Sequence, residues 1–115
     1  MRITKFRFWD GENMSFPFDV GDIIGGHADY EEGKSVVMQF TGLTDKSGNE
    51  IYEGDIVKQV MYDTYKSWYK AEVIFNRGSF CLNTGTIPET LIPELCEIIG
   101  NIYSNPELLT PLDTK

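Results

Sequence analysis

Short runs of alternating apolar and polar residues recur along the chain. The clearest covers residues 68–75, where every second residue from Tyr69 to Phe75 belongs to one face and those from Trp68 to Ile74 belong to the other. A period of two is typical of a half-buried β-strand. This stretch therefore predicts a strand with Tyr69 and Phe75 on the same face.

A similar run opens the chain at residues 5–9, where Phe6 and Phe8 share one face and Lys5, Arg7 and Trp9 share the other. It predicts a strand that buries the two phenylalanines and leaves Arg7 to solvent. Weaker patterns of the same kind predict further strands near residues 14–18, 36–40, 56–60, 79–82 and 95–103.

Turn signals separate these runs. Asn76-Arg77-Gly78 is typical of a hairpin turn. In residues 39–57, Gly42, Gly48 and Gly54 each predict a turn, because glycine tolerates the positive φ that tight turns require. Gly100, inside the last strand, indicates a bulge or a bend.

The order of these elements indicates a mainly β protein. Residues 1–50 are expected to form a small β-rich N-terminal portion, with a glycine- and carboxylate-rich variable loop at 19–35. Residues 51–103 supply strands of barrel-like length. Residues 104–115 form a tail in which Asn105 and Pro106 predict a short helical turn.

The formal net charge of −8 and a pI near 4.5 are spread along the chain. No basic stripe is present to neutralise phosphates, so general nucleic-acid binding is not expected; the acidic excess is accounted for by solubility. The N-terminus has no signal-peptide pattern and no apolar run is long enough to cross a bilayer. These features predict a cytoplasmic protein without membrane contact.

The few residues that commonly bind metals are scattered. Cys81 and Cys96 lie in apolar stretches, as buried thiols do, and no Cys/His spacing indicates a metal site. His27 has no sequence neighbour suited to a catalytic or metal pair. No cofactor is expected.

Three blocks resemble the YopX family of phages and prophages of Firmicutes. ITKFRFWD at residues 3–10 is similar to the family's KFRAWD, with Phe8 in place of alanine. QFTGLTDKSGNEIYEGDIV at residues 39–57 is similar to YTGLKDKNGKEIYEGDIV, and EIIGNIYSNPELL at residues 97–109 to IGNIYENPELL. The resemblance implies a β-rich fold with an SH3-like β-barrel and a role as a phage accessory protein. It implies no reaction, cofactor or catalytic residue.

The acidic residues of these blocks offer one candidate site. Asp10, Asp45, Glu50, Glu53 and Asp55 all lie in or beside turns, where carboxylates accept backbone N–H bonds. That structural role is the preferred interpretation. As a weaker alternative, Glu53 and Asp55 flank a glycine and could present oxygens to one divalent ion or share acid–base chemistry.

The aromatic residues offer another. Several of the candidates lie in loops or on outward strand faces, and the full set is Trp9, Tyr52, Tyr62, Tyr65, Trp68 and Tyr69. Packing explains any one of them by default, and the best candidate binding surface is the cluster Tyr62, Tyr65, Trp68 and Tyr69. Stacking of single-stranded bases is an alternative, opposed by the acidic field and by the small number of nearby basic residues, namely Lys58, Lys66, Lys70 and Arg77.

No reactive constellation accompanies this aromatic-rich scaffold. The leading hypothesis is therefore a non-enzymatic module that binds an unidentified protein of host or phage, or a further copy of itself as a homo-oligomer. The alternatives are a nucleic-acid-related role, by single-strand binding or by acidic mimicry of DNA toward a host protein, and a metal-assisted enzyme.

Overall fold

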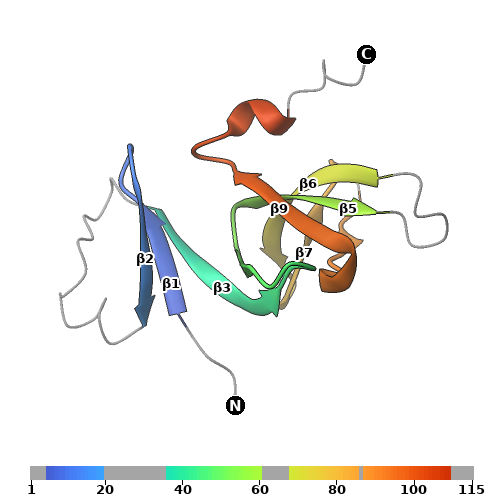
Figure 1. Ribbon diagram of the computed structural model, residues 1–115, viewed down its shortest axis with the longest axis horizontal. Coiled ribbons are helices and arrows are strands. Elements are labelled where there is room, and N and C mark those ends of the chain that lie inside the picture. Colours follow the sequence, from blue (N-terminus) through green and yellow to red (C-terminus); the bar gives the residue numbers. More distant parts are fainter. Residues whose placement is uncertain (1–4, 20–35, 61–67, 86, 110–115) are drawn as a thin grey trace.

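The protein folds as two antiparallel β-sheets that lie side by side, with almost no helix (Figure 1). The structure is a computed structural model and describes residues 5–19, 36–60, 68–85 and 87–109. The predicted mainly β fold is confirmed. Most of the predicted loop at 19–35, with His27, lies outside the described residues, as do Tyr62, Tyr65 and Lys66.

The first sheet has the strand order β2-β1-β3-β4. Its strands are β1 (Lys5–Trp9), β2 (Met14–Asp19), β3 (Val36–Thr44) and β4 (Glu50–Tyr52). The long strand β3 pairs with β1 through its first half and with β4 through its second half. It thereby carries the chain from the outer part of this sheet to the second one (Figure 1).

The second sheet has the order β8-β7-β6-β5-β9 and curls into a half-barrel. Its strands are β5 (Asp55–Val60), β6 (Trp68–Asn76), β7 (Ser79–Asn83), β8 (Glu89–Thr90) and β9 (Cys96–Asn101), followed by the short 3₁₀ turn η2 (Pro106–Leu109); a second such turn, η1 (Pro93–Leu95), precedes β9. Four strands form a meander and β9 returns to pair with β5. This arrangement agrees with the SH3-like barrel and short C-terminal turn expected from the sequence.

One apolar core fills the concave side of the half-barrel. Its buried residues are Ile51, Val57, Ala71, Val73, Leu82, Leu91 and Cys96. Ile51 comes from β4 of the first sheet, while the others come from the second sheet or the loop before β9. The two sheets therefore share part of one core.

The hairpin and the C-terminal bulge lie where the sequence predicts them. Arg77 and Gly78 have φ values of 53° and 87° and connect β6 to β7 as a two-residue turn. The β5–β9 register shifts next to Gly100, where Ile56 pairs with Gly100 and Val57 with Ile98.

Two local expectations were wrong. Gly42 does not turn the chain but lies within β3 at a register shift, where its φ of 87° produces a bulge. Arg7 is only 6% exposed, because both faces of β1 are covered at this point. Phe75, which shares a face with Val73 as predicted, is 53% exposed, whereas Val73 is fully buried. The cover of this face of β6 therefore ends between the two residues.

Candidate functional site: the groove between the two sheets

The turn Glu53-Gly54 between β4 and β5 is the joint at which the sheets meet. The backbone N–H of Glu53 donates to the Gln39 carbonyl of β3, and that of Gly54 donates to the Val73 carbonyl of β6. The Gly54 carbonyl accepts from the N–H of Ile102, which follows β9. Two adjacent residues thus connect three segments far apart in the sequence.

Only glycine suits this joint. Gly54 has a φ of 87°, which side-chain-bearing residues rarely adopt, and a Cβ here would lie 2.9 Å from Met38 Sδ. Gly100 is required for a different reason, since a Cβ there would lie 2.6 Å from the Asn105 side-chain oxygen and 2.8 Å from Leu108 Cδ1. Gly54 of the middle sequence block and Gly100 of the last therefore allow close packing.

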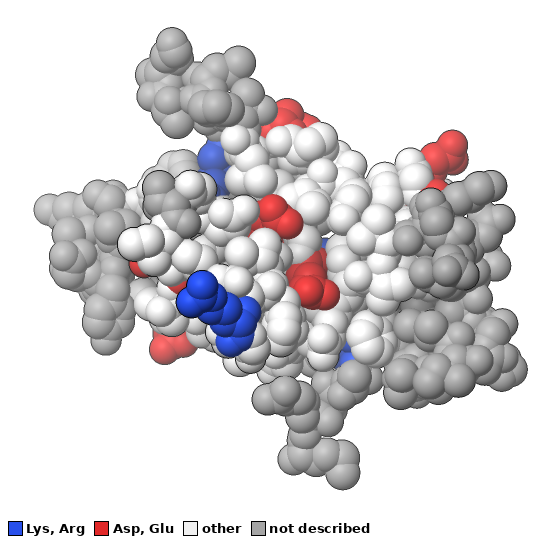
Figure 2. Space-filling view, turned by 180° about the vertical axis from the view of Figure 1, so that it is seen from behind, with Lys and Arg blue, Asp and Glu red and all other residues white. Residues whose placement is uncertain are grey.

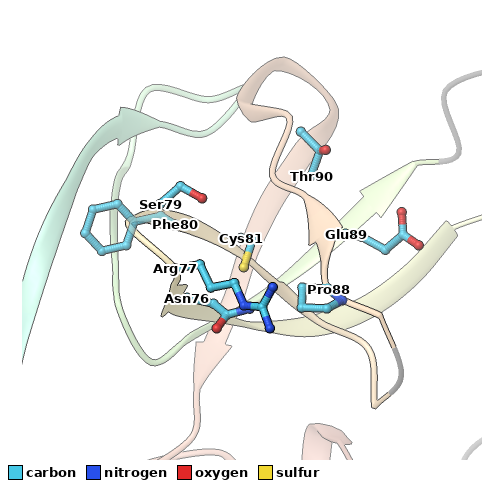
Figure 3. A pocket seen from close by; sticks show the side chains of 8 residues that line it. All are labelled: Asn76, Arg77, Ser79, Phe80, Cys81, Pro88, Glu89 and Thr90. Carbon is cyan, nitrogen blue, oxygen red and sulfur yellow. The ribbon is translucent and has the colours of Figure 1, made fainter.

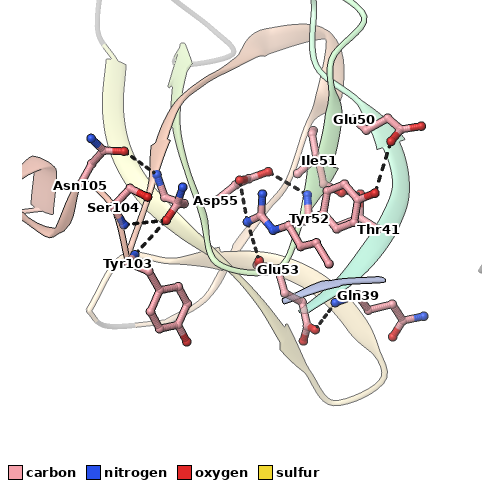
Figure 4. A network of polar contacts seen from close by, with 12 residues as sticks. Gln39, Thr41, Glu50, Ile51, Tyr52, Glu53, Asp55, Tyr103, Ser104 and Asn105 are labelled. Carbon is pink, nitrogen blue, oxygen red and sulfur yellow. Dashed lines mark hydrogen bonds and ion pairs between the residues drawn. The ribbon is translucent and has the colours of Figure 1, made fainter. Parts of the chain in front are cut away.

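A buried ion pair crosses the same joint (Figure 4). Arg7 Nη2 lies 2.8 Å from Asp55 Oδ1 and donates to the Glu53 carbonyl at 3.0 Å. The other Asp55 oxygen accepts from the Tyr52 N–H at 2.8 Å, and the Arg7 guanidinium lies 4.8 Å from the centre of the Tyr52 ring. Burial raises the pKa of Asp55, although Arg7 and the Tyr52 N–H act in the opposite direction.

Asp10 and Asp45 hold turns. Asp10 is exposed, and backbone N–H bonds from Asn13 and Glu12 lower its pKa. Asp45 accepts from the N–H groups of Ser47 and Asn49 within its own loop and from that of Ile98 in β9. Burial alone would raise the pKa of Asp45, but these three bonds outweigh it and lower the pKa. In the same loop, Gly48 has a φ of 89°.

Beside the joint lies a narrow groove of about 190 Å³ between β3, β6 and the segment after β9. Three of its apolar side chains are exposed, namely Val36 (39%), Val37 (37%) and Phe75 (53%). Met38, Gly54 and Val73 form its buried part, and Ile102 and Tyr103 line its far side. Tyr103 is fixed by a stacked Trp9 ring, with centroids 5.8 Å apart.

Two carboxylates, Glu53 and Glu72, also line this groove. Glu53 Oε1 accepts from the Gln39 N–H at 2.8 Å, whereas both Asp55 oxygens point to Arg7 and Tyr52 (Figure 4). Glu53 and Asp55 thus have separate partners. Within the described ranges, no group of three His, Cys, Asp or Glu residues is arranged to hold a metal ion.

The structure separates the two described members of the predicted aromatic cluster. Trp68 is 52% exposed and carries Lys58 Nζ 4.6 Å from its ring centre. Tyr69 packs against the half-barrel core, and its hydroxyl oxygen accepts from Gln59 Nε2. Tyr52 is buried and donates to Glu50 Oε1. Of the cluster's described residues, Trp68 alone offers a free aromatic face.

A wider hollow of about 670 Å³ lies beside the β6–β7 hairpin (Figure 3). Arg77 and Glu89 bring opposite charges to it, and the Phe80 ring points away from its centre toward the β3 side. Phe80 instead packs edge-on against Phe75, with centroids 5.0 Å apart. This hollow lacks the convergence of apolar side chains that marks the groove.

The two cysteines are buried and free. Burial, with a smaller contribution from the charge of Asp45, raises the pKa of Cys96 to about 11, so it stays a protonated thiol at neutral pH. None of the helical segments that the structure describes is long and apolar enough to cross a membrane. On the face shown in Figure 2, charged side chains are scattered over a broad uncharged surface.

Sequence reasoning missed the groove and Arg7. A buried aspartate such as Asp55 requires a cation nearby. Alternation, however, assigns Arg7 to solvent, and no sequence pattern relates Arg7 to Asp55, 48 positions later. Phe75 stands at the end of its strand, directly before the hairpin turn, and this position was the one available signal that its side chain could be exposed.

Comparison with known proteins identifies the family of this chain. The family model described as YopX protein matches residues 19–110. The chain belongs to the YopX family. The match includes the joint, the half-barrel and most of the groove, and it confirms the resemblance of the middle and last blocks. No curated protein matches the chain.

Solved structures of two similar proteins share the fold. Protein EF1440 from Enterococcus faecalis is 25% identical with a TM-score of 0.64, covering 95% of this chain and 99% of that one. Protein yopX from Bacillus subtilis is 24% identical with a TM-score of 0.61, covering 91% of this chain and 97% of that one. This chain therefore shares its two-sheet architecture with these two proteins over nearly its whole length.

Proposed function

We propose that this YopX-family chain is a non-enzymatic protein-binding module, an accessory protein of a phage or prophage that acts in the bacterial cytoplasm. The observation that carries the proposal is the convergence of exposed Val36, Val37 and Phe75 on one groove. Single exposed apolar residues need no explanation, but several gathered in a hollow are typical of an interaction site.

The size of the groove favours a protein partner over a small molecule. Sites for drug-sized ligands have volumes of about 300–1,000 Å³, and this groove has about 190 Å³. That space suits one or two side chains of a partner. Covering apolar surface contributes roughly 25 cal/mol per Å², so a few well-seated side chains suffice for specific contact.

Quantitative affinity purification of the full chain from host extract tests this proposal. The Val37→Ser and Phe75→Ser variants are each expected to recover at least about tenfold less of the main partner, because each substitution removes an apolar wall of the groove. The matched control is Trp68→Ser, which alters an equally exposed aromatic residue outside the groove and is expected to retain the partner. Equal recovery with all three variants would contradict the proposal.

A second candidate rests on a different surface. Lys58 and Lys70 are cross-strand partners on β5 and β6, and exposed Trp68 lies beside Lys58. A base could stack on such a ring while the lysines contact phosphate. Titration with oligo(dT) would then quench Trp68 fluorescence, and log K would fall linearly with log salt concentration. Absence of quenching at low salt would exclude this candidate.

A further inference from the structure

The groove contains an acidic group, Glu72, with no ion-pair partner among the residues that the structure describes. Glu72 lies in β6 opposite Ile56 of β5 and Asn83 of β7, and it is half buried. Among the described residues, no hydrogen bond or ion pair to its carboxylate is recorded, and burial raises its pKa. A partly buried carboxylate without a partner is costly, so an added cation here gains more than it would at the open surface.

Tyr103 links this carboxylate to the second one. Burial raises the pKa of Tyr103, and the negative charges of Glu72 and Glu53 raise it further, while Arg7 acts in the opposite direction. The tyrosine hydroxyl therefore lies in the field of both carboxylates. Arg7 is directed to Asp55 and the Glu53 carbonyl and does not line the groove.

The apolar lining of the groove complements its two carboxylates. Val36 and Val37 from β3 and Phe75 from β6 present exposed apolar surface to it. Lysine and arginine have the matching composition, since their aliphatic stems cover apolar surface while the charged head pairs with a carboxylate. A groove lined by both apolar side chains and carboxylates suits such a side chain.

We propose that the groove binds a lysine or arginine side chain of a partner protein, flanked in the partner by apolar residues that cover Val37 and Phe75. This inference rests on the proposed protein-binding function and names the chemistry of its partner. A second copy of the chain is a poorer occupant, because two molecules of net charge −8 repel each other.

Selection from a displayed library of random 12-residue peptides, with the full chain as bait, tests the inference. Enriched peptides are expected to carry Lys or Arg next to Leu, Ile, Val or Phe. One such peptide is then synthesised with a fluorescent label; if its basic residue is arginine, lysine is used in its place. A second version of the peptide carries norleucine instead of this lysine. Norleucine keeps the apolar stem and removes the charge.

Binding is measured by fluorescence anisotropy. Glu72→Gln in the protein and norleucine in the peptide are each expected to weaken binding by about 10- to 100-fold, the range of a charge-assisted hydrogen bond. The matched control is Glu97→Gln, which removes the same charge from an exposed side chain of β9 outside the groove. It is expected to change the affinity less than about twofold.

Thermal unfolding separates a binding role of Glu72 from a structural one. The raised pKa of Glu72 means that its charge opposes folding at neutral pH, so Glu72→Gln is expected to leave Tm unchanged or to raise it. A lowered Tm would show that the carboxylate stabilises the fold and would overturn the inference.

The other outcomes are distinct. The selection could enrich peptides without a basic residue whose binding is weakened by Phe75→Ser but not by Glu72→Gln. This result would overturn the inference of a lysine or arginine in the groove and leave the protein-binding proposal standing. Selection that yields no peptide dependent on Phe75 would count against both. A concentration-dependent dimer in sedimentation that is lost in Phe75→Ser would assign the groove to a second copy and overturn the inference.

Discussion

The two sheets are stabilised in different ways. The half-barrel surrounds a continuous apolar core that includes Val57, Val73 and Leu82, each fully buried. The first sheet joins it through a polar and aromatic junction, in which Arg7 pairs with Asp55 and stacks on Tyr52. Apolar packing needs no specific partner, whereas a buried ion pair fails if either member is lost. We therefore expect the first sheet to be the more easily perturbed part.

Two aspartates differ in whether their negative charge favours or opposes folding. Burial raises the pKa of Asp55 at the junction, so its charge opposes folding at neutral pH in spite of Arg7. Three backbone bonds lower the pKa of Asp45 in the loop between β3 and β4, so its charge favours folding. At Asp55 burial outweighs Arg7 and the Tyr52 N–H, whereas at Asp45 the three backbone bonds outweigh burial.

The largest effect is expected from Arg7→Ala. Removing the guanidinium leaves Asp55 buried without its cation, which costs about 3–5 kcal/mol in comparable cases. Amide hydrogen exchange should show loss of protection in β1 and β3 while β5, β6 and β7 keep theirs. The matched control, Lys5→Ala, removes a more exposed pair with Glu50 and is expected to cost about 0.2–1 kcal/mol. Equal loss of protection in both sheets would show one cooperative unit.

Leu82→Ala tests the other side of the comparison. Truncating this fully buried core residue is expected to lower the free energy of unfolding by about 2–5 kcal/mol, through lost burial and the cavity that remains. Urea denaturation measures the change. Exchange should accelerate throughout the molecule, because the first sheet depends on the half-barrel. Persistent protection in β1 and β3 would contradict that dependence.

Asp45→Asn is expected to have a smaller effect with a distinctive pH dependence. Asparagine keeps only one acceptor oxygen, so a backbone donor loses its partner at a cost of about 1–3 kcal/mol. Because the pKa of Asp45 is lowered in the folded state, its charge stabilises the fold above pH 3.8, the ordinary pKa of aspartate. This stabilisation is lost as the pH falls through the lower pKa of the folded state.

The difference in unfolding free energy between wild type and Asp45→Asn should therefore be constant near neutral pH and shrink below pH 3.8. Denaturation at a series of pH values measures it. Asp10→Asn, at an exposed turn, is the control and should show the weaker dependence. A difference that grows toward low pH would refute the assigned role of Asp45.

The sequence alone determined the fold class and most local structure. The alternation at residues 68–75, the Arg77-Gly78 turn and the bulge beside Gly100 depend on neighbours close in the chain, and so their patterns predict them. The family resemblance was likewise readable, because glycines such as Gly54 and Gly100 are fixed by backbone conformation or close packing that no other residue allows.

Only the tertiary structure decided which of these residues form a site. Alternation assigns a residue to one of two faces but does not say whether another segment covers that face, and this is why Arg7 is buried and Phe75 exposed. The groove brings together residues 36–37, 72–75 and 102–103, and no local rule relates positions so far apart. The sequence therefore determined the strands and turns of this YopX-family protein, and the packing of one sheet against the other decided where a partner could bind.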